Sequence, residues 1–183
     1  MSPKKTSIKS DTLRVTELLT QVEKLAYRNP SKRYVIGIPA EESIEENRIA
    51  LTPLTVDLLV NNGHEVIIQT NAGKAANFFD HQFSESGAII VKSKEEVFAQ
   101  SDILVKVSSL TDAEIGLLHE GQIILSILHV HTKTKEYIQK LTQKKITCLA
   151  FEYIKDENDC YPIVRSMSEI AGNTSVLIAA EYL

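Results

Sequence analysis

Three reactive residues lie near the ends of apolar segments: Arg48 in the stretch that follows the first segment, Lys106 near the end of another, and His129 directly after a third. An arginine guanidinium binds a carboxylate through two parallel, charge-assisted hydrogen bonds. A histidine whose backbone is held by a strand can act as a general acid or base near neutral pH. These residue types suit the binding of a carboxylate and the transfer of a proton, provided that the fold brings the three strand ends together.

Each of these residues also has a purely structural interpretation. Arg48 follows an acidic stretch and can pair locally with Glu45 or Glu46. His129 can be a hydrogen-bonded histidine of the core. Lys106, among apolar neighbours, is either a strand end that reaches solvent or part of a site. The residues alone leave these alternatives open.

A metal centre is not expected. His129 and His131 have a spacing that two ligands can use, but no third ligand stands near them. The sequence also has no GxGxxG, GxxxxGK[ST], HExxH or GxSxG motif. The chain therefore carries no recognisable nucleotide-binding fingerprint of its own.

The composition is that of an ordinary globular domain. Of the 183 residues, 43% are hydrophobic and 24% charged, with a net charge of −4. The lack of a basic cluster argues against nucleic acid as a partner, and no apolar run is long enough to span a bilayer. The polar N-terminus is not a secretory signal, so we expect a cytoplasmic protein whose two cysteines are reduced.

The first part of the chain precedes the main domain. Residues 1–10 are polar and predict a disordered tail. Residues 11–30 carry apolar side chains at three- and four-residue steps up to Asn29-Pro30, which predicts an added amphipathic helix.

Apolar strands then alternate with helices, which predicts an α/β fold. The expected strands cover 34–38, 64–70, 88–91, 102–107, 122–128 and 146–151. Helix starts are signalled by Thr52-Pro53 and by capping boxes at Ser93 and Thr111. The pattern indicates a doubly wound, mostly parallel Rossmann-like (flavodoxin-like) sheet with helices on both faces, whose functional groups gather beyond the carboxyl ends of the strands.

The final segment predicts one more helix. Ser166 and Glu169 read as a capping box that opens it, and its apolar positions run to the last residue without a closing signal. A helix that stops within its pattern indicates that the sequence is a fragment of a longer protein.

Five separated motifs resemble the N-terminal part of alanine dehydrogenases and of the related nicotinamide nucleotide transhydrogenase alpha subunits. They are "IGIPAEESIEENRIALTP", "NNGHEVIIQTNAGKAANFFD", "DILVKVSS", "GQIILSILH" and "MSEIAGNTSVLIAAEYL". The resemblance covers residues 33–183. It implies two Rossmann-like domains around a cleft: a substrate-binding, catalytic domain over 33–166, and an NAD-binding domain to which 167–183 begins the connector.

The resemblance also implies roles for single residues. Arg48, in "ENRIALTP", matches the family arginine that binds the carboxylate of pyruvate or alanine. His129, in "SILHV", matches the family histidine that acts as acid and base on the substrate. Met167 and Ser168, in "SMSEIAG", match a turn that borders the cofactor.

The chain departs from the family pattern at Ser108. Alanine dehydrogenases resembling this chain read lysine-valine-lysine-glutamate-proline there, and their second lysine contacts the substrate. Lys106 matches the first lysine, whereas Ser108 stands in place of the second. By strand alternation Lys106 lies on the same face as position 108, but it begins about 6–7 Å further back along the strand than that position.

The resulting expectation is the substrate-binding domain of an alanine-dehydrogenase-like oxidoreductase. It would use NAD, act on a small 2-oxo or 2-amino acid, form a homo-oligomer when full length, and be inactive as an isolated fragment. The alternatives are a proton-translocating transhydrogenase subunit and a non-catalytic or altered-specificity relative that binds an amino or oxo acid.

Overall fold

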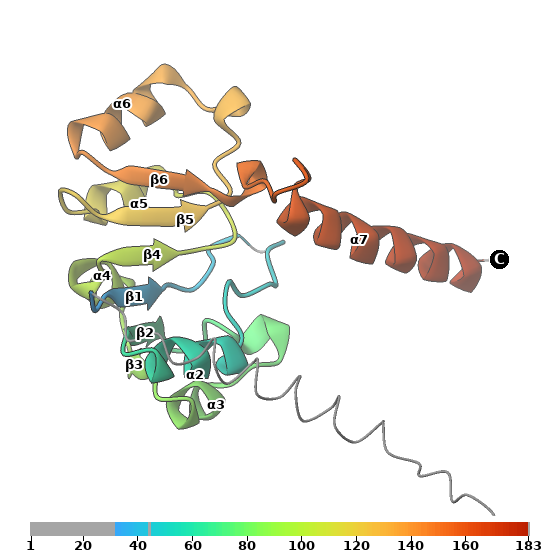
Figure 1. Ribbon diagram of the computed structural model, residues 1–183, viewed down its shortest axis with the longest axis horizontal. Coiled ribbons are helices and arrows are strands. Elements are labelled where there is room, and N and C mark those ends of the chain that lie inside the picture. Colours follow the sequence, from blue (N-terminus) through green and yellow to red (C-terminus); the bar gives the residue numbers. More distant parts are fainter. Residues whose placement is uncertain (1–31, 44, 183) are drawn as a thin grey trace, which may run out of the picture.

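Six short parallel strands form one sheet in the computed structural model, which describes residues 32–43 and 45–182 (Figure 1). Each strand lies inside one of the apolar segments that predicted it, and each is shorter because the ends of those segments enter loops. The strands are β1 (Val35–Ile38), β2 (Glu65–Gln69), β3 (Ile89–Val91), β4 (Ile103–Val105), β5 (Ile123–Ser126) and β6 (Thr147–Ala150).

The strand order is β3-β2-β1-β4-β5-β6, and every neighbouring pair is parallel. This is the order of a doubly wound Rossmann sheet, in which the direction of winding reverses between β1 and β4. The expected fold class is confirmed. Because the strands point the same way, their carboxyl ends meet at one edge, and the crevice beyond β1 and β4 is where such sheets bind ligands.

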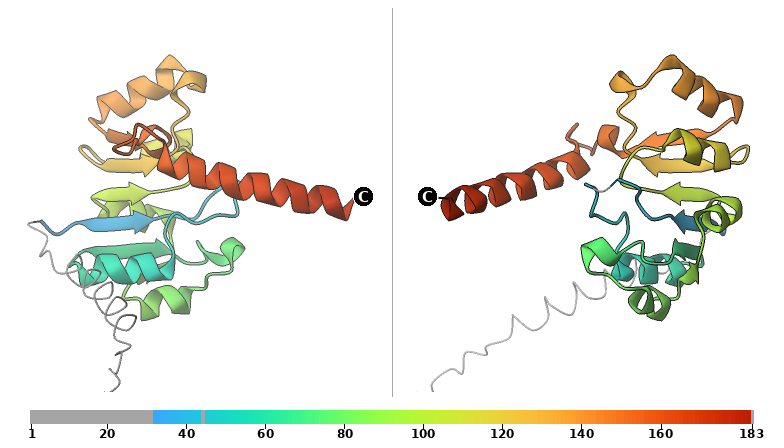
Figure 2. Two further views of the ribbon diagram at one scale, coloured as in Figure 1. Left: turned by 45° about the vertical axis from the view of Figure 1, so that its right-hand side comes forward. Right: turned by 180° about the vertical axis from the view of Figure 1, so that it is seen from behind.

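Helices cover both faces of the sheet. The helices α2 (Pro53–Asn61) and α3 (Asp80–Glu85) pack on one face, and α4 (Lys94–Gln100), α5 (Asp112–Leu117) and α6 (Lys135–Gln143) pack on the other (Figures 1 and 2). Single-turn 3₁₀ segments lie between them: η1 (Lys74–Ala76), η2 (Val130–Thr132) and η3 (Phe151–Tyr153).

Strand alternation divides the core between these two faces. On β2, Ile67 packs into the cluster under α4, α5 and α6, whereas its neighbours Val66 and Ile68 pack under α2 and α3. Leu104 and Val105 of β4 divide in the same way. Successive side chains of a strand point to opposite faces, so an apolar run is the pattern that a sheet covered on both sides requires.

The helix starts follow the predicted caps. Thr52 accepts a hydrogen bond from the backbone N–H of Thr55 and caps α2, with Pro53 in its first turn. Ser93 caps α4 in the same way, by accepting from the backbone N–H of Glu96, but the side chain of Glu96 does not complete the predicted capping box. Thr111 and Glu114 form the reciprocal capping box of α5. The short α3 was not predicted, since its one buried side chain, Phe83, shows no period.

The last helix, α7 (Pro162–Glu181), begins earlier than expected. Pro162 starts it, and Ser166 lies within it, where its Oγ donates to the carbonyl of Pro162 at 2.9 Å. Glu169 instead pairs with Arg165 at 2.9 Å. The predicted capping box at Ser166 is therefore wrong, because a proline at the first helical position already starts the helix. Figure 2 shows α7 leaving the carboxyl edge of the sheet and extending away from it.

The two segments predicted before the main domain, 1–10 and 11–30, lie outside the described residues. The two cysteines, Cys148 and Cys160, are both free thiols. Among the described helices, none has the length and apolar character to cross a membrane.

Gly37, in the middle of β1, lies where α4 comes close to the sheet. A Cβ added there would stand 2.0 Å from Oγ of Ser101 and 2.8 Å from Cγ1 of Val97. Because this space is already filled, we expect Gly37→Ala to lower the free energy of unfolding by about 1–3 kcal/mol. Urea denaturation of the purified variant measures this change.

Gly116 on α5 provides the matched control for that measurement. It is exposed, and a Cβ added there would meet nothing within 4 Å. Gly116→Ala is expected to leave the free energy of unfolding unchanged or raise it by about 0.5–1 kcal/mol. An equal effect of the two substitutions would contradict the close approach of α4 to β1.

Candidate functional site

The carboxyl edge of the sheet brings together the loops that carry the predicted site residues. Arg48 lies on the loop after β1, Lys106 and Ser108 follow β4, and His129 follows β5. Since β4 lies between β1 and β5, these three loops are neighbours at the edge. The topology thus meets the condition that the strand ends converge.

Arg48 is held by Glu46. Its Nε donates to Oε1 of Glu46 at 2.8 Å and its Nη2 to Oε2 at 2.7 Å. The backbone N–H of Arg48 donates to the same carboxylate at 3.0 Å. The local pair that the sequence allowed is therefore present. The hydrogen bond with Arg48 holds the pKa of the Glu46 carboxyl below its usual value, in spite of partial burial.

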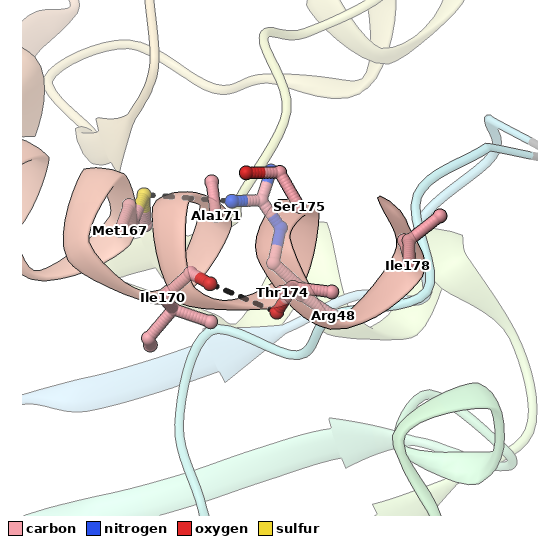
Figure 3. A pocket seen from close by; sticks show the side chains of 7 residues that line it. All are labelled: Arg48, Met167, Ile170, Ala171, Thr174, Ser175 and Ile178. Atoms are coloured by element: carbon pink, nitrogen blue, oxygen red, sulfur yellow. Dashed lines mark hydrogen bonds between the residues drawn. The ribbon is translucent and has the colours of Figure 1, made fainter. Parts of the chain in front are cut away.

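The remaining nitrogen of the Arg48 guanidinium faces α7. Its Nη1 lies 3.4 Å from Sδ of Met167, and a thioether is a weak acceptor. The side chain remains 52% exposed. Figure 3 shows Arg48 reaching across to Met167, Ala171 and Ser175 on one side of α7. One edge of the guanidinium is thus fixed by a carboxylate, while Nη1 remains available for a stronger acceptor.

Two hollows meet at Arg48 and Met167. One, of about 420 Å³, is drawn in Figure 3 and lies along α7, where its other lining residues are Ile170, Ala171, Thr174, Ser175 and Ile178. The other, of about 290 Å³, lies at the carboxyl ends of β4 and β5 and includes Lys106. Apart from Arg48 and Lys106 its lining is apolar: Ile49, Ala50, Leu51, Val105, Val107, Leu125, Phe151, Ile163 and Met167.

Lys106 is fully buried, with a side chain only 1% exposed. Its Nζ donates to Oε1 of Glu114 at 2.6 Å and lies 3.7 Å from Oε2 of Glu41. The alternative of a strand end reaching solvent is therefore wrong. Although Lys106 lines the hollow that Arg48 borders, its ammonium group is already compensated by two carboxylates.

The acidic loop after β1 gains a role from this cluster. Oε1 of Glu41 accepts from the backbone N–H of Val107 at 2.7 Å, and Oε2 accepts from the hydroxyl of Ser108. Glu42 pairs with Lys94 and accepts from the hydroxyl of Thr111 at 3.3 Å. These contacts attach the loop that carries Arg48 to β4, α4 and α5.

Glu114 is the central anion of this network. Oε1 accepts from Lys106 and, at 3.1 Å, from Lys94, while Oε2 accepts from the backbone N–H of Thr111 at 2.9 Å. Burial raises the pKa of the Glu114 carboxyl, but the hydrogen bond and charge of Lys106, together with the hydrogen bonds from Thr111 and Lys94, outweigh it, so the pKa lies below its usual value. Glu114 therefore stays ionised and holds the two lysines.

His129 is exposed at the sheet edge and does not belong to the core. The interpretation as a core histidine is therefore wrong. Strand β5 ends at Ser126, and His129 has left-handed backbone angles, φ 47° and ψ 48°, directly before η2. His131 lies in η2, so it does not share a strand face with His129. Among the described residues, no group of three or more His, Cys, Asp or Glu could hold a metal ion.

The structure brings only part of the predicted site into one hollow. Arg48, Lys106 and Met167 line the 290 Å³ hollow, and His129 and Ser108 do not. Met167 and Ser168 lie on α7 and not in a turn, because the helix already begins at Pro162. Ser168 is exposed, and its hydroxyl donates to the carbonyl of Val164 at 2.9 Å.

Three glutamates of the site were not predicted: Glu41, Glu114 and Glu152. In the sequence, Glu41 is one of several loop acids, and Glu114 carries the signal of a capping residue. Glu152 follows the last strand, and the rule that functional groups gather beyond carboxyl strand ends is the signal that points to it. Its Oε1 accepts from the backbone N–H groups of Leu128 and His129, each at 2.9 Å.

Residues 37–171 match the family model described as alanine dehydrogenase/PNT, N-terminal domain. The chain is 36% identical over 149 residues to an alanine dehydrogenase of Methanococcus maripaludis, and 34% identical over 148 residues to that of Mycobacterium tuberculosis. Each alignment covers 81% of this chain and 40% of the relative. The chain thus spans less than half the length of these relatives.

Solved structures show the same likeness. An L-alanine dehydrogenase superposes with a TM-score of 0.77 and 34% identity, over 81% of this chain and 41% of that chain. A transhydrogenase from Sinorhizobium meliloti superposes with a TM-score of 0.61 and 22% identity, over 66% of this chain and 35% of that chain. The second likeness concerns the fold alone.

The matched segment includes the loop of Arg48 and the strand ends that carry Lys106 and His129. Its Rossmann sheet also agrees with the structural neighbours. The chain therefore belongs to the alanine dehydrogenase/PNT N-terminal domain family, a family of oxidoreductases.

Proposed function

We propose that this chain is the substrate-binding domain of an NAD-dependent dehydrogenase that interconverts L-alanine with pyruvate and ammonium. The observation that carries the proposal is the position of Arg48. In a chain of this family, it lies at the ligand-binding edge of the sheet, beside an apolar hollow of about 290 Å³. The family resemblance further supports a cytoplasmic, homo-oligomeric full-length protein.

Arg48 binds the substrate carboxylate in this proposal. Glu46 fixes the Nε and Nη2 side of the guanidinium, which sets its orientation. Among the described residues, the one hydrogen-bond partner of Nη1 is the sulfur of Met167, and a carboxylate oxygen is a much stronger acceptor than a thioether. A substrate carboxylate therefore displaces Met167 at Nη1 without breaking the pair with Glu46.

His129 transfers the proton. Its imidazole is exposed at the edge on which Arg48 lies, so it is accessible to a substrate. In the proposed reaction it takes or gives a proton at the oxygen or nitrogen substituent of the reacting carbon. Positioned general acid–base catalysis of this kind contributes about 10²–10⁴-fold to a rate.

NAD, when bound, exchanges hydride with the substrate carbon. The hollow along α7 suits the nicotinamide end of such a cofactor, because its wall beside Arg48 is formed by Met167, Ile170 and Ala171. Met167 keeps its proposed cofactor contact. Ser168 is not among the lining residues, and we assign it no contact.

A relative of altered specificity, or one that binds without catalysis, is the second candidate. The contact between Ser108 and Glu41 favours it. By resemblance, alanine dehydrogenases place a substrate-binding lysine at position 108, and Lys106 cannot replace it while Glu114 holds its ammonium group. The substrate then meets one cation, Arg48, where the family pattern offers two. The transhydrogenase alternative is supported by the family model, whose description also names PNT, and by likeness of fold.

Titration of pyruvate into the full-length protein by calorimetry tests the role of Arg48. We expect Arg48→Gln to weaken binding roughly 10- to 100-fold, because a hydrogen bond to a charged group contributes about 1.5–3 kcal/mol. Arg33→Gln is the control, since Arg33 is 69% exposed and pairs with Glu65 at 2.8 Å on the opposite edge of the sheet. Equal affinities of the two variants would refute the assignment.

The same preparation separates the two candidate functions. Binding of pyruvate together with oxidation of NADH in the presence of ammonium supports the dehydrogenase. Binding of a 2-oxo acid without any oxidation of NADH supports the second candidate.

A further inference from the structure

Glu152 lies under the loop that presents His129. It follows β6 within η3, and one of its oxygens, Oε1, accepts the backbone N–H groups of both Leu128 and His129 at 2.9 Å. Its second oxygen, Oε2, is buried and has no hydrogen-bond partner among the described residues. Glu152, just after β6, thus binds the backbone that follows the neighbouring strand β5.

The backbone that Glu152 holds is strained. His129 has φ 47° and ψ 48°, the left-handed region that residues other than glycine rarely adopt. Such a conformation costs about 1–3 kcal/mol and persists only where the surroundings hold it. On the other side of His129, its carbonyl accepts from the backbone N–H of Thr132 at 2.8 Å and from the Thr132 hydroxyl at 2.9 Å. Both ends of this residue are therefore fixed.

The carboxylate form of Glu152 suits this contact. Burial raises its pKa, but the backbone hydrogen bonds, including those from Leu128 and His129, together with the charge of His129, bring it below its usual value. An ionised acceptor makes roughly twice as strong a hydrogen bond as a neutral one. A glutamate also has the reach from η3 to two consecutive N–H groups, which an aspartate in the same place lacks by one methylene.

We infer that Glu152 is a positioning residue for the proposed reaction: by binding the backbone N–H groups of Leu128 and His129, it holds His129 in the left-handed conformation that presents the imidazole at the sheet edge. The inference rests on the proposed function of His129. It differs from a general structural role, because the contact acts on the one residue that is assigned proton transfer.

Three substitutions of Glu152 distinguish the effect of its side-chain length from the effect of its charge. Glu152→Gln keeps the length and an acceptor oxygen, Glu152→Asp keeps the charge but shortens the side chain, and Glu152→Ala removes both. In the full-length protein, amide hydrogen exchange is measured at Leu128 and His129, and kcat and KM are measured with pyruvate, ammonium and NADH. Glu157→Gln, at an exposed glutamate of the following loop, is the control.

We expect Glu152→Ala and Glu152→Asp to lose amide protection at Leu128 and His129 by roughly tenfold or more, with a similar fall in kcat, because each hydrogen bond to a carboxylate is lost. Glu152→Gln keeps the reach and an acceptor oxygen but makes weaker hydrogen bonds, so it loses less amide protection and less kcat than Glu152→Asp. KM for pyruvate, which Arg48 determines, changes little in all three. If amide protection and kcat were lost in Glu152→Gln but retained in Glu152→Asp, the inference would be overturned in favour of a charge effect.

The inference also fails if kcat is unchanged in Glu152→Ala, or if kcat falls while the two amides stay protected. A fall in kcat with an equal rise in KM and a lower melting temperature would indicate damage to the fold and would overturn it as well. Failure of the proposed function is seen separately, as turnover by His129→Ala equal to that of the unchanged protein.

Discussion

Replacing Glu114 with glutamine is expected to lower the free energy of unfolding by about 3–5 kcal/mol, since the change leaves a buried charge without its partner. Lys106 and Glu114 are each only 1% exposed and lie 2.6 Å apart. In Glu114→Gln the nearest remaining carboxylate is Glu41, 3.7 Å from the lysine nitrogen. Urea denaturation of the purified protein near neutral pH measures the loss.

A surface pair gives the matched control. Glu120 pairs with Lys145, and both side chains are largely exposed. Because exposed ion pairs contribute about 0–1 kcal/mol, Glu120→Gln is expected to change stability by no more than that. The double variant Glu114→Gln with Lys106→Met should recover much of the loss, because an apolar side chain of similar size needs no counter-charge. Equal effects of Glu114→Gln and Glu120→Gln would show that the buried pair is not formed.

The contribution of Glu114 to the free energy of unfolding changes with pH in a defined direction. The pKa of Glu114 is lower in the folded protein than its ordinary value of 4.5, so the unfolded state binds more protons in the window below that value. The stabilisation by ionised Glu114 is therefore complete above the unfolded-state pKa and is lost as the pH falls through the folded-state pKa. The stability difference between the unchanged protein and Glu114→Gln should shrink as the pH decreases below 4.5. A difference that grows on acidification would contradict this linkage.

Replacing His129 with alanine is expected to lower kcat by about 10²–10⁴-fold, the contribution of a positioned general acid and base. The histidine is exposed at the sheet edge, so its removal leaves no cavity in the core and should have little effect on stability. KM for pyruvate should change little, because Arg48 binds the carboxylate. Steady-state assays of the full-length protein with pyruvate, ammonium and NADH measure both constants.

His131→Ala is the matched control for this experiment. His131 lies in η2, two residues after His129, and is also exposed, with its ring nearly perpendicular to that of Tyr153 at a centroid distance of 6.4 Å. Because it carries no proposed role, its removal should leave kcat close to that of the unchanged protein. A kcat unaffected by His129→Ala, or lowered equally by both substitutions, would sink the assignment of His129.

Ser108 bears on how large these catalytic effects can be. Its hydroxyl donates to Glu41, whose other oxygen holds the backbone N–H of Val107. The position is therefore part of the framework that anchors the Arg48 loop to β4. Placing a lysine there would bring a second ammonium group close to Lys106, and Glu41 would have to serve both.

The sequence alone determined the fold class and the order of strands and helices along the chain. Apolar runs such as "YVIGI" and "DILVKV" are local signals of strands covered on both faces, and caps such as Thr52-Pro53 mark helix starts through contacts within one turn. These features depend on neighbouring residues, so a pattern of neighbours predicts them. The family motifs likewise indicated Arg48 and His129, both of which lie at the expected edge.

The tertiary structure decided what each charged residue does. Lys106 could not be interpreted from its apolar neighbours, because its partners Glu41 and Glu114 come from other segments of the chain. In the same way, the support of His129 by Glu152 depends on β5 and β6 being neighbours in the sheet. Charge compensation and backbone strain arise between distant segments, so only the folded arrangement shows that the acids of this chain hold its basic groups in place.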